Sequence, residues 1–287
     1  MNRYIALIIT LFSILFATTD IVAKDKVTKK KAELRPQLPM PETIVTRAQP
    51  QKPLAPVAEI GSHKLAGSAT SARVVASGTG VHIAQQRGGI DVSHYNGQID
   101  WNRVARNGKV LYAICKATEN TSMVDNTFNY NTREARKAGI PVGSYHFFTP
   151  NISGKAQFEH FKRTVDMNTQ DVITMLDVEV RGKEPLEEFH RKIREWLDAF
   201  EAEYHYKPMI YTSLNFYNKY LAGPFDDYIW MIAKYGEGAP NPKNSIPFAT
   251  WQYTSNGVVE GINHRTDLSC FMDHYDLKDI LIKTYVK

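Results

Sequence analysis

Aromatic residues are confined almost entirely to one part of this sequence, and that distribution decides where a hydrophobic core can form. Residues 24–86 contain no Phe, Tyr or Trp, and all but three of the chain's aromatic residues lie after this stretch. Aromatic side chains bury large areas and dominate the energetics of cores. We therefore expect one folded domain at residues 87–287, where roughly 200 residues suffice for a single core.

The first 23 residues have the pattern of an export signal. Arg3 gives a short positive region, and the apolar run of residues 5–17 follows it. A run of about 13 residues fits a signal peptide and falls short of the ~20 residues that span a bilayer. Cleavage after Ala23 would suit this pattern. We predict a signal peptide at 1–23, with an uncleaved anchor as the alternative, and export to the periplasm, the cell envelope or the medium.

Residues 24–86 have the composition of a disordered linker. Ten Lys and Arg stand against four Asp and Glu, prolines recur in the first half, and Gly, Ser, Ala and Thr dominate the second. So little apolar surface cannot offset the entropy cost of folding. The pI near 9.0 therefore reflects this basic, Pro/Ala/Ser-rich linker, because the rest of the chain is nearly neutral. We expect no nucleic-acid partner for the folded domain.

Two cysteines, Cys115 and Cys270, are too few for a disulfide scaffold. An exported protein can join them in one bridge, but both lie in apolar contexts where free thiols behave as small hydrophobic groups. Both alternatives stay open. Neither cysteine has the spaced partners of a zinc site, and the His-Glu-x-x-His motif of metalloproteases is absent. We expect no metal and no cofactor.

From residue 88 onward, short apolar runs alternate with helical stretches. The expected strands are residues 89–93, 111–118, 141–147, 172–180, 209–212, 228–233 and 249–253, with a last one near Asp267, and the expected helices are residues 126–138, 155–165 and 185–204. Such alternation predicts a parallel sheet. About eight strands in ~200 residues favour an α/β fold, a short, irregular TIM-type (β/α) barrel with fewer helices than usual. An open doubly wound sheet is the alternative, but no Gly-rich phosphate loop follows a strand.

Carboxylates follow several of these strands. Asp177 and Glu179 end the apolar run that begins at Val172, and alternate residues of a strand project to the same side. Strand C-termini form the active-site mouth of a barrel. Two neighbouring carboxylates can hold different protonation states, as glycoside cleavage requires. Asp91 and Asp267 end two further strands, although either could equally be a turn residue.

Aromatic and polar side chains near other strand ends suit a sugar site. Aromatic faces pack on sugar rings, and Gln and Tyr hydrogen-bond the ring substituents. The candidates at predicted strand C-termini are Tyr145, Tyr211, Trp230 and Gln252. His94 and His146 are interpreted as structural histidines.

Seven segments, taken together, resemble glycoside hydrolase family 25, the N,O-diacetylmuramidase lysozymes. In order they are Gly89–Trp101 (GIDVSHYNGQIDW), Lys116–Glu119 (KATE), Gly143–Phe147 (GSYHF), Leu176–Glu179 (LDVE), Ile210–Thr212 (IYT), Trp230–Gly236 (WMIAKYG) and Trp251–Ser255 (WQYTS). The similarity spans roughly residues 88–275. It departs from the family pattern at His264-Arg265-Thr266, just before Asp267, but keeps the carboxylate.

The resemblance implies an irregular barrel that hydrolyses the β-1,4 bond between N-acetylmuramic acid and N-acetylglucosamine in peptidoglycan glycan strands. Glu179 would be the general acid/base, and Asp177 would stabilise the anomeric centre or orient an acetamido group that attacks it. Asp91 and Asp267 would complete the acidic catalytic cluster. The implied substrate-binding residues are Tyr145, Tyr211, Trp230, Gln252 and Lys116.

Two other functions remain as alternatives. One is a wall-binding module that has lost catalysis, which the presence of all four acidic residues disfavours. The other is a chitinase-like hydrolase, whose Asp-x-Asp-x-Glu pattern this chain lacks because Met175 occupies the first position. We expect a monomer that contacts a membrane only through an uncleaved N-terminal anchor.

Overall fold

The computed structural model describes residues 87–286. The predicted signal peptide or anchor (1–23) and the predicted linker (24–86) lie outside these residues, so they stay predictions. No helix within residues 87–286 is both long enough and apolar enough to cross a membrane.

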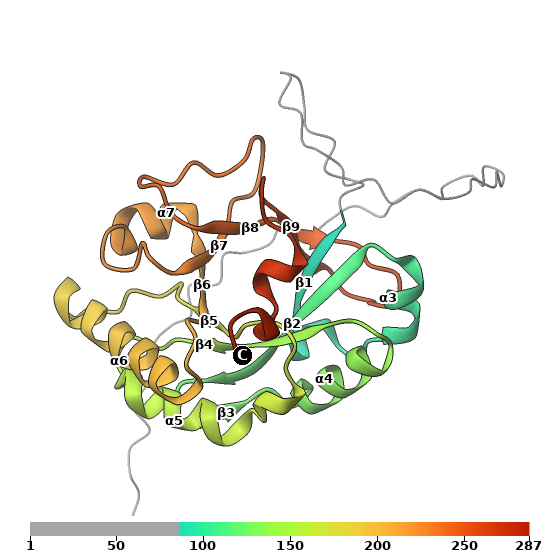
Figure 1. Ribbon diagram of the computed structural model, residues 1–287, viewed down its shortest axis with the longest axis horizontal. Coiled ribbons are helices and arrows are strands. Elements are labelled where there is room, and N and C mark those ends of the chain that lie inside the picture. Colours follow the sequence, from blue (N-terminus) through green and yellow to red (C-terminus); the bar gives the residue numbers. More distant parts are fainter. Residues whose placement is uncertain (1–86, 287) are drawn as a thin grey trace, which may run out of the picture. The chain divides into compact units, whose positions relative to one another are not determined.

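Eight strands close into a barrel (Figure 1). The strands are β1 (Gly88–Val92), β2 (Val110–Glu119), β4 (Val142–Phe147), β5 (Met175–Asp177), β6 (Met209–Ser213), β7 (Ile229–Ala233), β8 (Phe248–Gly257) and β9 (Thr266–Phe271). Around the barrel their order is β1, β9, β8, β7, β6, β5, β4 and β2, and a pairing between β2 and β1 closes the ring. A short ninth strand, β3 (Met123–Val124), pairs only with the end of β2. The fold is thus the predicted short, irregular TIM-type barrel.

The sheet of the barrel is mixed, so the prediction of a parallel sheet is wrong for one strand of the barrel, β9. The strand pairs from β1 through β2 and β4 to β8 are parallel, whereas β9 runs antiparallel to both β8 and β1. The physical reason is the connection between β8 and β9. Only residues 258–265 join them, which is too short for the crossover helix that a parallel neighbour requires.

Helices cover the outside of the barrel (Figure 1). They are α3 (Trp101–Asn107), α4 (Phe128–Lys137), α5 (Gly154–Thr164), α6 (Leu186–Tyr204) and the single turn α7 (Leu214–Phe216), which continues into η4 (Tyr217–Leu221). The longest, α6, agrees with its prediction to within one residue. Its buried residues, Phe189, Ile193, Trp196, Leu197 and Phe200, recur at the three- and four-residue spacing of an amphipathic helix. α3 was not predicted.

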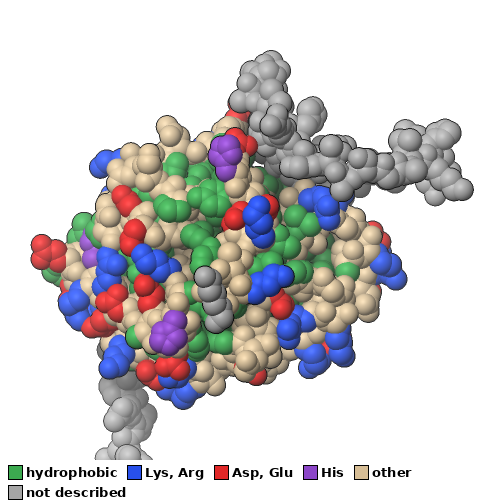
Figure 2. Space-filling model, viewed as in Figure 1, with side chains coloured by type: hydrophobic (Ala, Val, Ile, Leu, Met, Phe, Trp, Pro, Cys, Tyr) green, Lys and Arg blue, Asp and Glu red, His purple; other side chains and the backbone are tan. Residues whose placement is uncertain are grey.

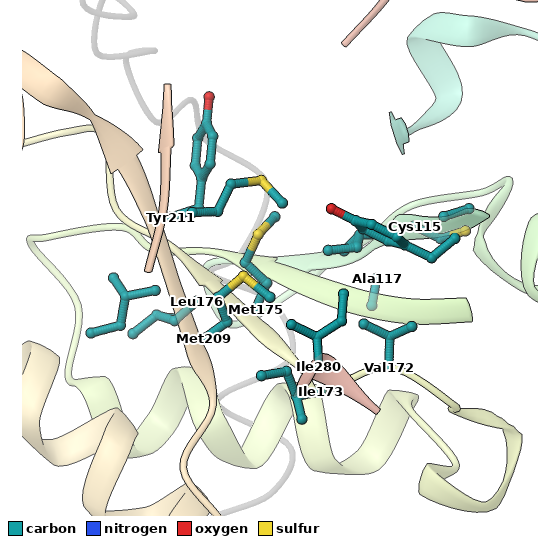
Figure 3. Packing of buried hydrophobic residues seen from close by; sticks show 14 of the residues in the cluster. Cys115, Ala117, Val172, Ile173, Met175, Leu176, Met209, Tyr211 and Ile280 are labelled. Carbon is teal, nitrogen blue, oxygen red and sulfur yellow. The ribbon is translucent and has the colours of Figure 1, made fainter. Parts of the chain in front are cut away.

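The fourth predicted strand, residues 172–180, is much shorter in the structure. Only Met175–Asp177 forms the β5 ladder, and Val172 makes a single bridge to Leu281. The reason is the C-terminal segment, in which η5 (Leu277–Ile280) and η6 (Ile282–Thr284) pack against residues 172–173. Figure 3 shows Ile280 beside Val172 and Ile173 at this end of the core. The remaining 3-10 turns are η2 (His94–Asn96) and η3 (Met167–Thr169).

Cys115 and Cys270 are both buried free thiols. The disulfide alternative is therefore wrong, and the alternative of small hydrophobic thiols holds. Cys115 points into the core from β2 (Figure 3).

Candidate active site

The four predicted carboxylates gather at one end of the barrel. Asp91 on β1 is the register partner of Asp267 on β9, so the two face each other across an antiparallel pair. Asp177 closes β5, opposite Tyr211 on β6, and Glu179 follows two residues later. Burial raises the pKa of Asp91, Asp177 and Asp267, the charge of Glu179 adds to the rise at Asp177 and Asp267, and the charge of Asp267 adds to that at Asp91. The four carboxylates thus form one electrostatic cluster at the mouth.

Backbone contacts fix the position of the β5 end. The amide of Phe148 donates to the Asp177 carbonyl at 2.9 Å, and the amide of Val178 donates to the Tyr211 carbonyl at 3.0 Å. The Thr212 hydroxyl donates to the Val178 carbonyl at 2.6 Å. The residue between the two carboxylates is therefore held by β6 on both its polar groups, which sets where Asp177 and Glu179 project.

Asp91 and Asp267 hold their protons more tightly than ordinary aspartates. Burial raises the pKa of Asp91 to about 7, with a further contribution from the Asp267 charge, and a hydrogen bond from Gln252 partly offsets this rise. Burial and the charge of Glu179 raise the pKa of Asp267 to about 6. One oxygen of Asp91, Oδ1, is buried and finds no hydrogen-bond donor among residues 87–286. A proton on that oxygen removes the cost of burying an unpaired charge.

Asp177 and Glu179 differ in their access to water. Asp177 is only 6% exposed, and burial together with the Glu179 charge raises its pKa well above the ordinary value, against an opposing effect of Lys116. Its Oδ1 also lacks a donor within the described chain. Glu179 is exposed at the mouth, yet protein surrounds it closely enough that desolvation raises its pKa too, while Tyr211 and Lys116 lower it. A solvent-facing acid thus stands beside a buried one.

Hydrogen bonds from Gln252 on β8 connect this cluster. Its side-chain nitrogen donates to Asp91 Oδ2 at 3.0 Å, and its oxygen accepts from the hydroxyls of Tyr211 (2.8 Å) and Tyr235 (2.7 Å). Burial raises the pKa of Glu179, and the Tyr211 hydroxyl nearby opposes this rise. Because a phenol has one proton, Tyr211 can serve either Gln252 or Glu179. Tyr235 was not a predicted site residue, although it lies inside the quoted WMIAKYG segment.

Lys116 and Tyr145 also face the carboxylates. The Lys116 ammonium bonds Glu119 at 2.7 Å and lies 5.1 Å from the centre of the Phe147 ring. Its charge favours ionisation of Asp177 and Glu179. Burial and the Asp177 charge raise the pKa of Tyr145 well above its ordinary value, so Tyr145 remains a neutral phenol beside the cluster.

Trp230 does not lie at the site, so its prediction as a substrate-binding residue is corrected. Its side chain is fully buried, its indole nitrogen donates to the Phe225 carbonyl at 3.2 Å, and its ring packs against Tyr217 in η4. It therefore points outward from β7 into the layer between the barrel and η4, which precedes β7 in the chain. Residues alternate sides along a strand, so a one-residue difference in register separates core from site.

The two histidines are structural, as interpreted. His146 is fully buried, bonds Thr118 at 2.7 Å and Gln157 at 3.1 Å, and burial lowers its pKa to about 3. His94 donates its backbone amide to Asp125 and lies 2.6 Å from that carboxylate through Nδ1.

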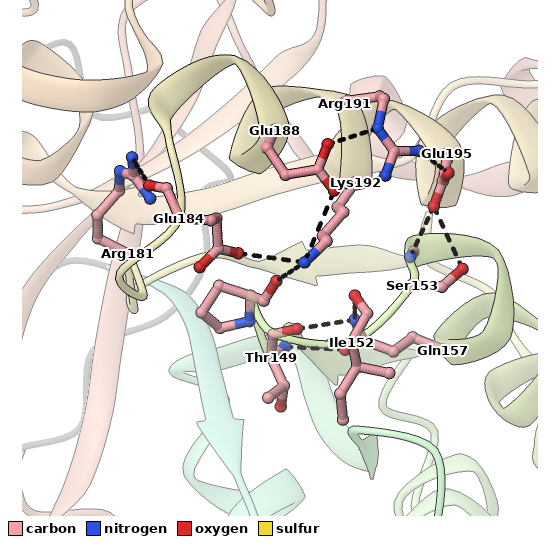
Figure 4. A network of polar contacts seen from close by, with 12 residues as sticks. Thr149, Ile152, Ser153, Gln157, Arg181, Glu184, Glu188, Arg191, Lys192 and Glu195 are labelled. Atoms are coloured by element: carbon pink, nitrogen blue, oxygen red, sulfur yellow. Dashed lines mark hydrogen bonds and ion pairs between the residues drawn. The ribbon is translucent and has the colours of Figure 1, made fainter.

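The loop from β5 to α6, residues 178–185, carries Glu179 and is anchored from both sides (Figure 4). Lys192 of α6 donates to the Pro150 carbonyl at 3.0 Å and pairs with Glu184 at 3.4 Å. Arg181 donates to the Glu184 carbonyl and lies 4.9 Å from the centre of the Phe189 ring. These contacts join the loop to α6 and to the preceding β4–α5 connection, and so restrain Glu179.

A cavity of about 1110 Å³ lies elsewhere. It opens where β4 and β5 begin, is lined by residues such as Arg136, Pro141, Asp171 and Leu281, and includes none of the predicted site residues. We assign the site to the carboxylate mouth because strand C-termini hold the active sites of barrels and because the perturbed carboxylates gather there. Within residues 87–286, no group of three or more His, Cys, Asp or Glu side chains is arranged to hold a metal ion.

Comparison with known proteins agrees with this geometry. The family model of glycosyl hydrolases family 25 matches residues 90–262, which carry Asp91, Asp177 and Glu179. The chain belongs to glycosyl hydrolases family 25. This family 25 chain is accordingly a glycoside hydrolase, and the match includes the quoted segments from Ile90 to Ser255.

Individual relatives extend the likeness. The chain is 38% identical over 187 residues to "Uncharacterized protein YegX" of Escherichia coli K12, covering 64% of this chain and 68% of the relative. It is 33% identical to "Lysozyme M1" of Streptomyces globisporus, covering 64% of this chain and 67% of that one. Among solved structures, the bacterial lysozyme of Streptomyces coelicolor superposes with a TM-score of 0.61 at 28% identity, covering 70% of this chain and 97% of that structure.

Proposed function

We propose that this family 25 enzyme is a muramidase, which hydrolyses the β-1,4 bond between N-acetylmuramic acid and N-acetylglucosamine in peptidoglycan. The observation that carries the proposal is the Asp177–Glu179 pair, one acid buried and one open to the mouth, inside a cluster with Asp91 and Asp267. The names of the relatives, lysozymes of Streptomyces and an "N,O-diacetylmuramidase" of Arthroderma benhamiae, support peptidoglycan as the substrate.

Glu179 serves as the general acid. Its raised pKa keeps a proton available, and its exposure lets that proton reach the glycosidic oxygen of a bound strand. Once the leaving sugar departs, the ionised Glu179 can accept a proton from the attacking water. Tyr211, which can turn its hydroxyl from Gln252 to Glu179, stabilises that ionised form.

Asp177 responds to the charge of the reacting sugar. Protonated, it can hydrogen-bond the acetamido group and orient it; ionised, it opposes the positive charge that develops at the anomeric carbon. That positive charge and Lys116 both favour ionisation, so the pKa of Asp177 falls as the transition state forms. Asp91 is joined to this cluster through Gln252, and the charges of Asp91 and Asp267 both contribute to the raised pKa of Asp177, after burial and Glu179.

The test is Glu179→Gln with purified peptidoglycan, and the exposed Glu260, which pairs with Arg103, gives the matched control Glu260→Gln. We expect Glu179→Gln to lower kcat by about 10²–10⁴-fold with unchanged thermal unfolding, and Glu260→Gln to behave as wild type. Mass spectrometry of the released fragments should show N-acetylmuramic acid at the new reducing end. N-acetylglucosamine at that end would contradict the proposed bond. Digestion by Glu179→Gln at the wild-type rate would contradict the mechanism. Binding of the wild-type protein to the wall without release of fragments would favour a binding module.

The work of such an enzyme lies outside the cytoplasm, where the wall is. We propose that residues 1–23 direct export and that residues 24–86 tether the domain, in line with the wall-lytic names of its relatives. N-terminal sequencing of the exported protein tests this. A new terminus after Ala23 supports cleavage, an intact Met1 in the membrane fraction supports an anchor, and an intact cytoplasmic chain contradicts export.

A further inference from the structure

Tyr95 is an exposed aromatic residue at the rim of the active-site mouth. It is 77% exposed, and it lies in η2, the turn that directly follows β1 and Asp91. An exposed aromatic ring offers a flat apolar face on which a ligand can bury area, and this ring lies in the turn beside the carboxylate mouth.

The turn that carries Tyr95 is rigid. The Ser93 hydroxyl accepts from the Tyr95 amide at 3.3 Å, and the Asn96 side chain accepts from the Ser93 amide at 2.9 Å. Asn96 also donates to the Arg265 carbonyl at 3.1 Å, just before β9. The backbone of Tyr95 is therefore fixed to the strands that bear Asp91 and Asp267, so a ligand that packs on the ring does not have to order this turn.

A second aromatic ring supports Tyr95 from behind. The His94 ring lies 4.0 Å from the Tyr95 ring, centre to centre, at an angle of 38°. Burial opposes ionisation of Asp125, but hydrogen bonds from Thr127 and His94 outweigh it and lower the pKa of Asp125. An ionised carboxylate only accepts hydrogen bonds, so Nδ1 of His94 donates to it and the imidazole is held in place.

The position of this pair fits a long substrate. Along the shorter way round the barrel, only β2 and β4 separate β1 from β5, which ends at Asp177. Three inter-strand spacings amount to about 14 Å, the length of a few sugar rings. A glycan strand cleaved at Glu179 and lying toward β1 would bring a later ring of the same strand to Tyr95.

We infer that Tyr95, backed by His94, forms a distal glycan subsite that packs on the face of a pyranose ring remote from the cleaved bond. The occupant is a neutral sugar of the same strand, because the exposed ring face is apolar and, among residues 87–286, no Lys or Arg side chain lies over it to select a stem peptide. This inference rests on the proposed function. It predicts that the enzyme prefers long strands over short ones because of Tyr95.

The experiment compares kcat/KM on glycan strands freed of stem peptides with kcat/KM on the shortest fragment that is cleaved. In Tyr95→Ala we expect the long-to-short ratio to fall about five- to tenfold, the range for one aromatic packing contact. Tyr95→Phe, which keeps the ring face, should retain most of the ratio. Val258→Ala removes an equally exposed apolar side chain, 75% exposed, from the β8–β9 connection and should keep the wild-type ratio.

A long-to-short ratio of kcat/KM that stays at the wild-type value in Tyr95→Ala would overturn the subsite. If both kcat/KM values fall by the same factor, the ratio is unchanged as well, and the variant has a distorted mouth. A change in oligomeric state would instead identify the ring as a protein contact. Binding of the long strands to Glu179→Gln, with and without Tyr95→Ala, keeps the two proposals separate. If wild type cleaves neither substrate, the proposed function fails, while the binding comparison still decides the subsite.

Discussion

At the residue scale, the Asp91 carboxyl opposes stability and serves the site. Its pKa of about 7 in the folded chain, against an ordinary 3.8, means that the folded state keeps a proton that the unfolded state releases between these pH values. The folded state therefore binds more protons in this window, and stability falls as pH rises through it. Below pH 3.8 Asp91 therefore costs the folded state nothing, and above about pH 7 the folded state bears the full penalty of its buried charge.

Asp91→Asn should remove this penalty. The amide can still accept the hydrogen bond from Gln252, and it carries no charge beside Asp267. We expect the variant to be more stable than wild type at pH 8, by on the order of a few kcal/mol, and nearly equal to it at pH 4. Thermal unfolding across this range measures the difference, with the exposed Asp273→Asn as control. A gain of stability at pH 4 that vanished at pH 8 would contradict the sign.

The side of a strand that an individual residue faces could not be predicted from the sequence. The pattern placed Tyr211, Gln252 and Trp230 equally at strand ends, but only the first two face the carboxylates. The side that a residue faces depends on strand register, which no local spacing of aromatic residues reveals.

At the scale of elements, the β5–α6 loop decides where Glu179 lies. Gly182 in this loop has φ of 71°, and a Cβ there would lie 2.5 Å from Glu184 Oε2 and 3.0 Å from Pro150 Cβ. The glutamate end can move, but the proline ring cannot. Gly108 has a similar φ of 66° with no atom within 4 Å of such a Cβ, so it isolates the backbone cost alone.

We expect Gly108→Ala to lose about 1–2 kcal/mol of stability from the left-handed backbone and to keep wild-type kcat. Gly182→Ala should lose about 1 kcal/mol more, on the scale of crowding in a packed site, and should lower kcat about tenfold or more because the loop shifts Glu179. Urea unfolding and hydrolysis rates measure the two effects. Equal behaviour of the two variants would show that contact with Pro150 does not position the loop.

At the scale of the whole molecule, β9 closes the barrel between β1 and β8. The C-terminal segment with η5 and η6 covers the end of the barrel that lies opposite the carboxylates. In Figure 1 this segment lies over the centre of the barrel, and in Figure 2, seen from the same side, Lys and Arg side chains are interspersed with Asp and Glu. The Ile173 amide donates to the Ile280 carbonyl at 2.8 Å, and the Ile280 side chain is fully buried. The segment thus completes the core far from the carboxylates.

Ile280→Ala should therefore destabilise the fold without altering the chemistry. A buried isoleucine truncated to alanine costs about 2–5 kcal/mol, so the urea midpoint should fall while kcat at permissive temperature stays at the wild-type value. The half-buried Ile282 in the same segment gives the control Ile282→Ala, with a smaller loss expected. A lower kcat in folded Ile280→Ala would mean that this end of the barrel communicates with the mouth.

From the sequence alone, the alternation of apolar runs and helical stretches predicted the barrel, and the ordered motifs predicted that Asp91, Asp177, Glu179 and Asp267 lie at strand ends. These follow from composition, periodicity and ordered motifs, which are local in the chain. The antiparallel direction of β9, the shortness of β5 and the outward direction of Trp230 became visible in the folded structure. It also brought Tyr235 to Gln252. Those outcomes depend on register and on packing between distant segments, because the free energy of burial is set by neighbours that the local sequence does not specify.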